Sequence, residues 1–599
     1  MTYYSALYQN RINWLKIIIY LVATVFLVKI VNFQIFRYAY YSKIAERNKT
    51  QIIARNAPRG RIFSADKVMI AGNKPSFTLA YFPLDRENYP EPQKICVDIS
   101  RYLDIPVSEV SEKIYSAIKR NVPVKIAAGL SSREMLKISE LKTFYPGLNI
   151  ISEAGRFYPM HNFLSHIVGY LGKINPKEWE YYKSRNYSMD AYVGKAGLEK
   201  RFEQELKGVD GGMYLEVDSK GRLIQVLESR KSLPGADIYL TIDSRIQKAA
   251  EDGLKESLSG EGAVVAVNPQ NGKILAIADY PNFDPGRMLK GKVGGDTQEF
   301  NLAAQGSFPP GSVFKIVVSA AALELGSVDI NRKFYCPGYF DAGARVFRCW
   351  KKEGHRRVAF YDGFAHSCDV YFYHVGLLAG PYNIEKFSKM FGLGRKTGVE
   401  IDNESKGNIF GPGARVKNKK YWFIGDTLNL SIGQGELLVT PMQMAQMISA
   451  VANGGKFWRP YYVEKVVDRN GRRVFSRSAH LQRKIRLKQS TWLHLRKALS
   501  EVVEKGTGRA AKISGAEVFG KTGTAQNPHG SDHAWFVSYA QVAGRPSEIA
   551  VAVLVAFGEH GASAAAPIAR KVMEAALKED LNRSVASGRR GASDRNKGR

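Results

Sequence analysis

A serine and a lysine stand three residues apart in the segment FPPGSVFKIVVSAAALELG, near the middle of the chain. Pro310 and Gly311 lead into a helix that is predicted to run from about Ser312 to Gly326. Residues three apart share one face of a helix, so the Lys315 amine is expected within hydrogen-bond reach of the Ser312 hydroxyl. The helix N-terminus also favours negative charge that develops at the serine. The pair predicts a serine nucleophile with a lysine base.

Two further motifs strengthen this interpretation, which alone is weak because a capping serine beside a surface lysine has the same pattern. The start of a second helical stretch carries Ser367, Cys368 and Asp369. A predicted strand carries Lys521, Thr522, Gly523 and Thr524. The three motifs together predict acyl transfer through a serine ester.

Strand and helix patterns on both sides of these motifs predict the domain that must hold them. ADIYLTID from Ala236 is a predicted strand, the segment from Ser244 a helix, and GAVVAVNPQNGKILAIADY from Gly262 two strands joined by a turn. VFGKTGTAQ, HAWFVSYAQV and IAVAVLVAF are three more strands, followed by a helix from Ala566. The prediction is an α+β domain over residues 236–581, in which both ends build an antiparallel sheet that helices cover.

Residues 48–232 mix short strand-like runs with helices and loops, without an internal repeat. The segment 57–73, APRGRIFSADKVMIAGN, suits an extended hairpin, and 193–211, VGKAGLEKRFEQELKGVDG, suits a glycine-punctuated amphipathic helix. Neither motif carries catalytic residues. We therefore predict a non-catalytic pedestal or dimerisation domain over 48–232.

The N-terminal region contains an apolar run, WLKIIIYLVATVFLVKIVNFQIF over residues 14–36, that reaches membrane-spanning length. Lys16 and Lys29 can snorkel or face a partner helix. No small-residue cleavage signal follows, which favours an uncleaved anchor over a removed signal peptide. A buried core helix is the remaining alternative. An anchor with residues 1–13 in the cytoplasm would place the bulk of the chain outside it.

Charge and composition narrow the function classes. The 599 residues include 87 Lys+Arg and 56 Asp+Glu, a net charge of +31, and 45% are hydrophobic, so a disordered or collagen-like chain is excluded. A balance this basic favours nucleic acid or an anionic membrane surface as partner. The anchor favours the membrane, and nucleic acid is not expected. Residues 583–599 are predicted to form a basic, disordered tail.

The three motifs resemble the signature of the penicillin-binding proteins and serine β-lactamases: Ser-x-x-Lys, Ser-x-Asn and Lys-Thr-Gly. PRGRI at 58–62, GRFYP at 155–159 and GQG at 433–435 are similar to class B penicillin-binding proteins, and within that class to the cell-elongation subfamily, penicillin-binding protein 2. The resemblance covers the whole chain. It implies a transmembrane helix, an elongated pedestal and a serine β-lactamase-like transpeptidase domain.

The resemblance also implies a role for each motif residue. Ser312 would attack the carbonyl of the penultimate D-Ala of a peptidoglycan stem peptide, and Lys315 would take its proton. Ser367 and Lys521 would complete the proton relay, with Lys521 also attracting the substrate carboxylate. The substrate would lie along the strand that carries Thr522, Gly523 and Thr524. The backbone N–H groups of Ser312 and Thr524 would form the oxyanion hole.

Asp369 departs from the family pattern, which has asparagine at this place. An amide both donates and accepts hydrogen bonds, whereas an ionised carboxylate only accepts. Two lysines nearby would keep Asp369 ionised. A relay or structural role is therefore favoured over substrate binding, and aspartate at this place is similar to the elongation subfamily.

Three of the four cysteines crowd with one histidine into 33 residues: Cys336, Cys349, His355 and Cys368. Tetrahedral zinc accepts three thiolates and an imidazole, although the spacing is not a finger pattern. A disulfide or unrelated buried thiols are the alternatives. The resemblance favours zinc, because penicillin-binding protein 2 homologues are associated with such a site. With four protein ligands the metal would be structural.

Several functions compete within the same chemistry: a septal transpeptidase of the same class, a membrane-anchored β-lactam sensor and a β-lactamase-like hydrolase. A hydrolase needs a base that deacylates the enzyme, and Glu404 is the only candidate, which we interpret as a loop charge. The resemblance implies a serine-type D-Ala-D-Ala transpeptidase or carboxypeptidase of the inner membrane that β-lactams acylate at Ser312. It also implies membrane partners from the elongation complex, above all a RodA-type SEDS glycosyltransferase.

Overall fold

The computed structural model describes residues 2–42, 50–83, 92–120, 123–145, 147–185, 187–189, 191–217, 223–289, 299–343 and 345–596. The chain divides into two compact units. The first contains residues 1–59, 73–156 and 207–235, and the second contains residues 60–72, 157–206 and 236–599. All the residues with predicted chemistry lie in the second unit.

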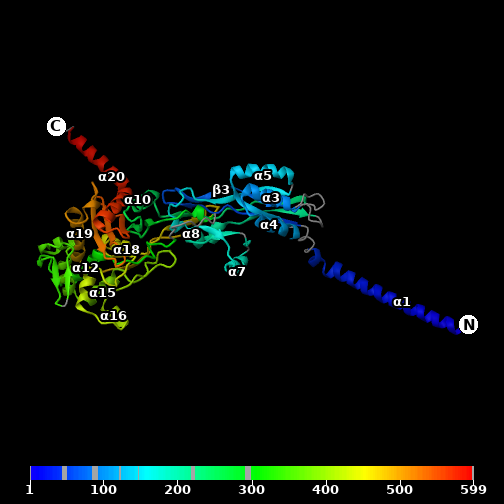
Figure 1. The fold of residues 1–599 in the computed structure, drawn as a ribbon, viewed down its shortest axis with the longest axis horizontal. Coiled ribbons are helices and arrows are strands. Elements are labelled where there is room, and N and C mark those ends of the chain that lie inside the picture. Colours follow the sequence, from blue (N-terminus) through cyan, green and yellow to red (C-terminus); the bar gives the residue numbers. More distant parts are fainter. Residues whose placement is uncertain are drawn as a thin grey trace. The chain divides into compact units, whose positions relative to one another are not determined.

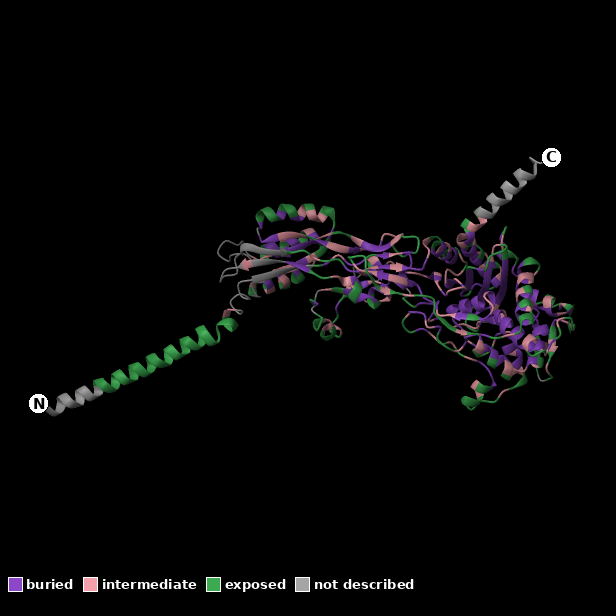
Figure 2. Cartoon of the chain, turned by 180° about the vertical axis from the view of Figure 1, so that it is seen from behind, coloured by how far each residue is buried: buried purple, intermediate pink, exposed green. Residues whose placement is uncertain are grey.

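The N-terminal helix α1 (Thr2–Val31) continues as a π-helical turn (Asn32–Phe36) and is drawn blue in Figure 1. Residues Ile12–Phe36 have a mean hydropathy of 2.2, and none of that apolar stretch is buried. Figure 2 colours the described residues of this stretch as exposed. The helix is long and apolar enough to cross a membrane.

The rest of the first unit contains two small sheets with helices. Strands β1 (Thr50–Arg55), β8 (Gly211–Val217) and β9 (Leu223–Arg230) form an antiparallel sheet. Residues Phe77–Tyr81 of β3 (Met69–Tyr81) pair with β4 (Val124–Leu130), and β3 also pairs with β5 (Leu148–Phe157). Helices α3 (Pro92–Leu103), α4 (Val107–Arg120) and α5 (Ser132–Phe144) pack there around a core of aliphatic side chains. Ser131 and Glu134 start α5 with a reciprocal capping box.

Parts of the predicted pedestal belong to the second unit instead. β2 (Ile62–Phe63) runs parallel to β10 (Asp237–Leu240), and β10 pairs with β18 (Val463–Val467), which pairs with β19 (Arg473–Ser476). The Arg61 guanidinium forms a salt bridge with the Asp237 carboxylate, in which Arg61 Nη2 lies 2.6 Å from Asp237 Oδ2. A single boundary near residue 236 therefore does not separate the two compact units. Strand pairing joins Ile62 to Ile238, which lies 176 residues further along the chain.

The centre of the second unit is a five-stranded antiparallel sheet in the order β12-β11-β23-β22-β21. Its strands are β11 (Gly262–Val267), β12 (Ile274–Tyr280), β21 (Glu517–Ala525), β22 (His533–Gln541) and β23 (Ile549–Val555). All of β11 is buried: Val264 and Ala266 pack toward α10 (Ser244–Lys255) and α20 (Ala566–Asn596), while Ala263 and Val265 face the opposite core. Helices therefore cover both faces, and the predicted α+β fold is confirmed.

The remaining described elements of the second unit surround the site or extend from the sheet. The principal helices are α12 (Lys315–Glu324), α13 (Phe360–Ala365), α14 (Asp369–Ala379), α15 (Pro381–Met390), α16 (Pro412–Lys417), α17 (Ile424–Ser431), α18 (Pro441–Ala452) and α19 (Gln489–Glu504). Short helices are α6 (Ser165–Val168), α7 (Trp179–Lys183), α8 (Gly197–Arg201), α9 (Glu203–Lys207) and α11 (Pro285–Leu289). Small two-stranded ladders pair β6 (Leu171–Lys173) with β7 (Tyr192–Gly194), β13 (Phe334–Cys336) with β16 (Arg356–Val358), β14 (Tyr339–Asp341) with β15 (Val346–Arg348), and β17 (Lys456–Trp458) with β20 (Leu481–Lys484).

The C-terminal region differs from the predicted disordered tail. Helix α20 starts on the sheet and continues to Asn596, so 583–596 are helical, and 597–599 lie outside the described residues. Extending a packed helix adds one hydrogen bond for each residue fixed and needs no new nucleus. The amino-acid composition of this segment, on which the prediction of a disordered tail rested, does not reveal the advantage of extending an existing helix.

Candidate active site

Ser312 lies in a 3-10 turn, Gly311–Phe314, that leads directly into α12. Gly311 has φ +54°, and a Cβ on it would stand 2.4 Å from the Thr524 carbonyl oxygen. Only glycine combines that backbone with so close an approach. The turn is held from its other side by the Gly311 N–H, which donates to the Gly433 carbonyl at 3.0 Å. The backbone of this turn thus places Ser312 next to β21.

Strand β21 also has a glycine where it meets this turn. A Cβ on Gly523 would stand 2.8 Å from the Val313 side chain and 3.0 Å from the Pro310 carbonyl oxygen. The Lys-Thr-Gly motif therefore needs its glycine for packing. On either side of Gly523, the Thr522 hydroxyl bonds the Thr507 hydroxyl at 2.6 Å, and Gln434 Nε2 donates to the Thr524 carbonyl at 3.5 Å.

Lys315 is completely buried and joins the first motif to the second. Its Nζ donates to the Ser367 carbonyl oxygen at 2.9 Å, to Ser367 Oγ at 3.2 Å and to Asp369 Oδ1 at 2.7 Å. An ammonium has three donors, and all three are used here. The expected hydrogen bond to Ser312 is not formed among the described residues, because the carboxylate and Ser367 attract the amine more strongly.

Ser367 sits in a strained position between α13 and α14. Its φ is +54°, in the left-handed region that non-glycine residues rarely adopt, and it is buried. The Ser367 N–H donates to the Phe364 carbonyl at 3.1 Å, and the neighbouring Cys368 N–H donates to the Gly363 carbonyl at 2.8 Å. These bonds fix the turn so that the Ser367 hydroxyl and carbonyl both meet Lys315.

Asp369 uses both carboxylate oxygens. Oδ1 accepts from Lys315, and Oδ2 accepts from the Trp350 backbone N–H at 3.0 Å. Its place in the first turn of α14 also favours negative charge. A group that accepts two hydrogen bonds from opposite sides suits a carboxylate, whose oxygens both accept. This geometry is compatible with either role expected for Asp369, in a proton relay or in the structure of the site.

Lys521 is completely buried on β21 and donates to the Thr522 carbonyl at 3.1 Å. Burial lowers the pKa of Lys521 well below its usual value, and the nearby Lys315 charge lowers it further, while Asp369 opposes the shift. The aromatic ring of Phe364 lies 5.8 Å from the amine. A lysine in this setting is suited to hold a lone pair rather than a charge.

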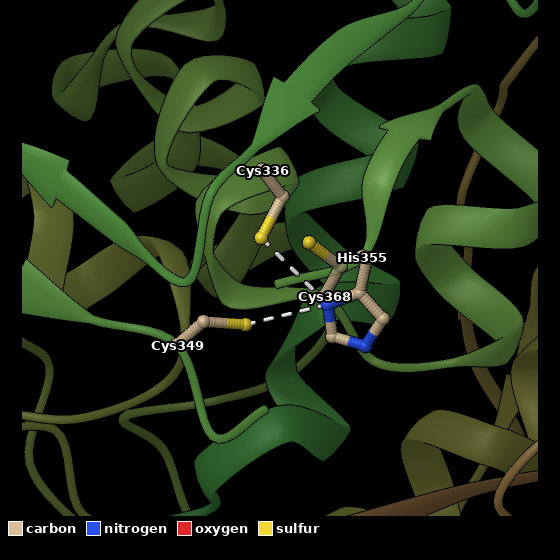
Figure 3. A group of neighbouring side chains, drawn as sticks. All are labelled: Cys336, Cys349, His355 and Cys368. Carbon is tan, nitrogen blue, oxygen red and sulfur yellow. Dashed lines mark hydrogen bonds between the residues drawn. The ribbon is translucent and has the colours of Figure 1, made fainter. Parts of the chain in front are cut away.

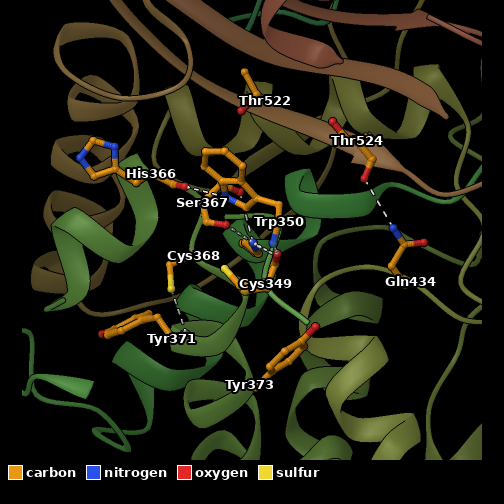
Figure 4. A network of polar contacts seen from close by, with 12 residues as sticks. Cys349, Trp350, His366, Ser367, Cys368, Tyr371, Tyr373, Gln434, Thr522 and Thr524 are labelled. Atoms are coloured by element: carbon orange, nitrogen blue, oxygen red, sulfur yellow. Dashed lines mark hydrogen bonds and ion pairs between the residues drawn. The ribbon is translucent and has the colours of Figure 1, made fainter. Parts of the chain in front are cut away.

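Figure 4 shows how these segments meet: Thr522 and Thr524 come from one strand, and Ser367, Trp350 and Cys368 from the turns beside it. The sequence motifs identified most of these residues. Trp350, Thr507 and Gln434 were missed as members of the site. Gln434 stands in the GQG segment, which offered a signal. Trp350 reaches Asp369 through its backbone N–H, which no side-chain pattern reveals, while its indole Nε1 donates to the His366 carbonyl at 3.1 Å.

The cysteines and histidine converge as predicted from their crowding (Figure 3). One donor atom from each of the four residues lies within 4.8 Å of the others, and the three thiols are buried. His355 Nδ1 is 3.7 Å from Cys336 Sγ and 3.5 Å from Cys349 Sγ. All four cysteines of the chain, with Cys96 in the first unit, are free thiols in the structure.

The electrostatics of this cluster suit a cation. Hydrogen bonds from Cys368 and His355 lower the pKa of the Cys349 thiol, whereas the contact with Cys349 and burial raise the pKa of the Cys368 thiol, so the first proton is lost from Cys349. Sulfurs on a tetrahedral zinc ion, at about 2.3 Å from the metal, stand about 3.8 Å apart. The observed spacing is close to that arrangement without any large movement. His355 Nε2 is buried and has no hydrogen-bond partner among the described residues.

The cysteine cluster is linked to the catalytic network through residues that are neighbours in the sequence. Cys349 precedes Trp350, whose N–H holds Asp369, and Cys368 lies between Ser367 and Asp369. Cys368 Sγ also accepts from the Tyr371 N–H at 3.4 Å and so caps α14. Whatever fixes the four donor atoms therefore also fixes the acceptors of Lys315.

Glu404, the one candidate for a deacylating base, has another role. It is buried, and its carboxylate accepts from the Thr397 N–H at 2.6 Å, from the Thr397 hydroxyl and from the Gly398 N–H at 3.1 Å. These bonds hold a loop and occupy both oxygens. This geometry agrees with the interpretation of Glu404 as a loop charge.

Comparisons with known proteins place this geometry in context. Residues 262–574 match the model of the penicillin-binding protein transpeptidase domain, and residues 54–240 match that of the penicillin-binding protein dimerisation domain. The peptidoglycan D,D-transpeptidase MrdA of Acinetobacter baumannii is 31% identical over 93% of this chain and 86% of its own.

Solved structures give the same likeness. A penicillin-binding protein 2 of Pseudomonas aeruginosa, in complex with WCK 5153, is 28% identical with a TM-score of 0.63, covering 88% of this chain and 97% of its own. A chain from a peptidoglycan synthase complex, solved to explain how polymerization and crosslinking are coordinated, is 26% identical with a TM-score of 0.68 and covers 94% and 98%.

Proposed function

The chain belongs to the penicillin-binding protein transpeptidase family, and we propose that Ser312 is the residue through which it cross-links peptidoglycan stem peptides. It is a peptidoglycan D,D-transpeptidase, an acyl-transfer enzyme that acts in cell elongation. The observation that carries the residue assignment is the buried Lys315 network, which joins residues of the first two motifs beside the strand that carries the third.

In the acylation step, Ser312 Oγ attacks the carbonyl carbon of the penultimate D-Ala. Lys315 in its neutral form has two donors and one lone pair, so it keeps two of its present bonds and turns the lone pair to the Ser312 hydroxyl. The backbone N–H groups of Ser312 and Thr524 stabilise the oxyanion, and one such donor is typically worth about a hundredfold or more in rate. The terminal D-Ala leaves with a proton passed through Ser367 Oγ, which already touches Lys315.

Lys521 has a role that changes when substrate binds. Its buried amine favours the neutral form in the free enzyme. A substrate carboxylate nearby would raise its pKa and allow it to hold a proton, which forms an ion pair with that carboxylate. In the second step the amine of an acceptor stem peptide attacks the ester, returns its proton through the same relay and frees Ser312.

The test is acylation of the full-length protein by a fluorescent penicillin, followed by release of the label. Wild type is expected to form a stable adduct that Ser312→Ala abolishes. Ser319→Ala is the matched control: Ser319 is a buried serine on α12, seven residues after Ser312, and its hydroxyl has no partner among the described residues. Labelling retained in Ser312→Ala would refute the assignment, and rapid release of the label would indicate a hydrolase.

We also propose that Cys336, Cys349, His355 and Cys368 hold one structural zinc ion. The convergent donor atoms and the low pKa of the Cys349 thiol support this. Bound there, the metal would crosslink β13, the segment after β15 and the start of α14, and its four protein ligands would leave no position for a reacting water. The chain itself holds Asp369 and Ser367 in the positions from which they contact Lys315.

Metal content and thiol counting test the zinc proposal. One zinc per chain is expected in the purified protein, and it should be lost in Cys349→Ser together with several degrees of melting temperature. Cys96→Ser is the control, because Cys96 is buried in the core of the first unit and lies outside the cluster. Absence of zinc together with two missing free thiols in the unfolded protein would establish the disulfide instead.

The exposed apolar helix supports a single-pass anchor in the inner membrane with the transpeptidase domain on the extracytoplasmic side. The similar chain from a peptidoglycan synthase complex supports a membrane partner that polymerises glycan, for which a RodA-type SEDS glycosyltransferase has the required activity. Co-purification from a shared membrane tests this. Replacing 12–36 with an unrelated spanning helix should keep the chain in the membrane and weaken the complex.

A further inference from the structure

A surface cavity of about 730 Å³, wide open to solvent, lies in the second unit and includes no residue of the three motifs or the cysteine cluster. Helix α15 forms one wall, and β20 with the residues after it forms another. The lining residues used here are Lys386, Lys389, Arg395, Arg483, Lys484 and Arg486. Helix α16 begins next to α15, and its Gly413 completes the lining (Figure 1).

The charge of this cavity is strongly unbalanced. It has six basic residues and one acid, Glu385. Glu385 is buried and already occupied: Oε1 pairs with Lys389 Nζ at 2.5 Å, and Oε2 accepts from the Gly413 N–H at 2.6 Å. The other five cations form no ion pair within the described residues. Four of these five side chains are exposed, so water screens part of their mutual repulsion, and a bound anion would remove more of it.

Arg483 is the best fixed of these cations. Its guanidinium carbon lies 4.3 Å from the centre of the Phe457 ring. A Cβ on Gly392 would stand 2.9 Å from Arg483 Nη2, so this glycine leaves room for the guanidinium. Arg483 Nε is buried and has no hydrogen-bond partner among the described residues. Burial and the charge of Arg395 lower the pKa of Arg483 to about 10. The site thus holds a rigid, partly desolvated donor.

We propose that this cavity binds an anion carrying two or more phosphate groups, either a soluble diphosphate or a phosphate-bearing lipid headgroup. Arginine forks match phosphate oxygens with paired hydrogen bonds, and lysines add point charges. Several uncompensated cations fit a multiply charged anion better than a single carboxylate. The volume is in the range of small-ligand sites.

The experiment uses the full-length protein in a neutral detergent and inorganic pyrophosphate as the probe, with binding measured by calorimetry. Arg395→Gln/Arg483→Gln is expected to weaken pyrophosphate binding at least tenfold. Arg469→Gln/Arg473→Gln removes the same charge from the exposed region around β19 and should change binding less than twofold. Acylation by penicillin should be the same in all three proteins, which shows that each is folded.

Further ligands distinguish the two sources of the bound anion, and their binding can refute the proposal. Tighter binding of a short-chain prenyl diphosphate than of pyrophosphate would indicate a lipid headgroup, and the reverse order a soluble diphosphate. Citrate carries three carboxylates, and binding as tight as that of pyrophosphate would refute the phosphate assignment. Equal losses in the two double variants, or no binding by wild type, would refute the site itself.

Discussion

Lys315 is the side chain on which the catalytic geometry depends, because its three donors meet Ser367 and Asp369 and leave none for Ser312. The spacing of Ser312 and Lys315 predicted one helical face, and the two residues do lie on consecutive turns. What the spacing could not reveal is the competition for the amine. That competition is decided by Asp369, which comes close only through the tertiary fold.

Asp369→Asn tests this carboxylate. The amide keeps the shape but loses one acceptor and the charge, so we expect acylation by penicillin to slow by about tenfold or more, equivalent to at least about 1.4 kcal/mol in the barrier. Asp369 raises the pKa of Lys521. Removing its charge lowers that pKa, so Lys521 loses the proton that pairs with the substrate carboxylate at a lower pH, and the alkaline limb of the pH–rate profile should move to lower pH.

A surface change serves as the control. Asp362→Asn makes the same substitution on α13, where the carboxylate is exposed and pairs with Lys505 at 3.2 Å. Its acylation rate and pH profile should equal those of wild type. An alkaline limb that moves to higher pH in Asp369→Asn would contradict the role given to Lys521.

Lys521→Met separates stability from activity. A buried amine with a depressed pKa binds fewer protons in the folded than in the unfolded chain, so stability rises with pH until the unfolded lysine loses its proton. At neutral pH, methionine removes this cost, and thermal unfolding should occur about 2 to 4 °C higher for each ~1 kcal/mol relieved. Acylation should fall to background. A lower melting temperature would show that the buried amine stabilises the fold.

At the scale of elements, the strand and helix patterns predicted the five-stranded sheet well because each strand is a short apolar run bounded by turn residues. Segments whose partners lie far away in sequence were less predictable. Ile62 pairs with Ile238 in a parallel ladder, and no local pattern in PRGRI indicates that partner. The cysteines could be grouped by their spacing, whereas the Trp350 N–H on Asp369 could not, since every residue except proline has that donor.

Gly311→Ala tests the junction of the nucleophile turn with β21. The new Cβ would stand 2.4 Å from the Thr524 carbonyl oxygen, so the turn must move away from the strand. We expect loss of penicillin acylation and a fall in stability of more than about 1 kcal/mol. Gly326→Ala is the matched control: φ there is +66° and nothing lies within 4 Å of the new Cβ, so only the backbone strain remains. Full acylation in Gly311→Ala would contradict the model of the turn.

At the scale of the whole molecule, the apolar helix and the catalytic site lie in different units. Removing residues 1–42 should therefore release the protein from membranes without changing the rate of penicillin acylation at Ser312. Fractionation after an alkaline wash checks the first part, with the full-length chain as the retained control. A truncated chain that still pellets with membranes would show a second membrane contact.

The interleaving of the two units has a consequence for how the protein is made. The chain passes between them after residues 59, 72, 156, 206 and 235. If it is exported from its N-terminus, the early segments 60–72 and 157–206 emerge long before β18 and β21, on which their unit depends. They must wait without their final partners, exposed to proteases and to wrong strand pairing. If the chain is exported, its folding should therefore depend on chaperones more than that of an enzyme whose domains follow one another along the chain.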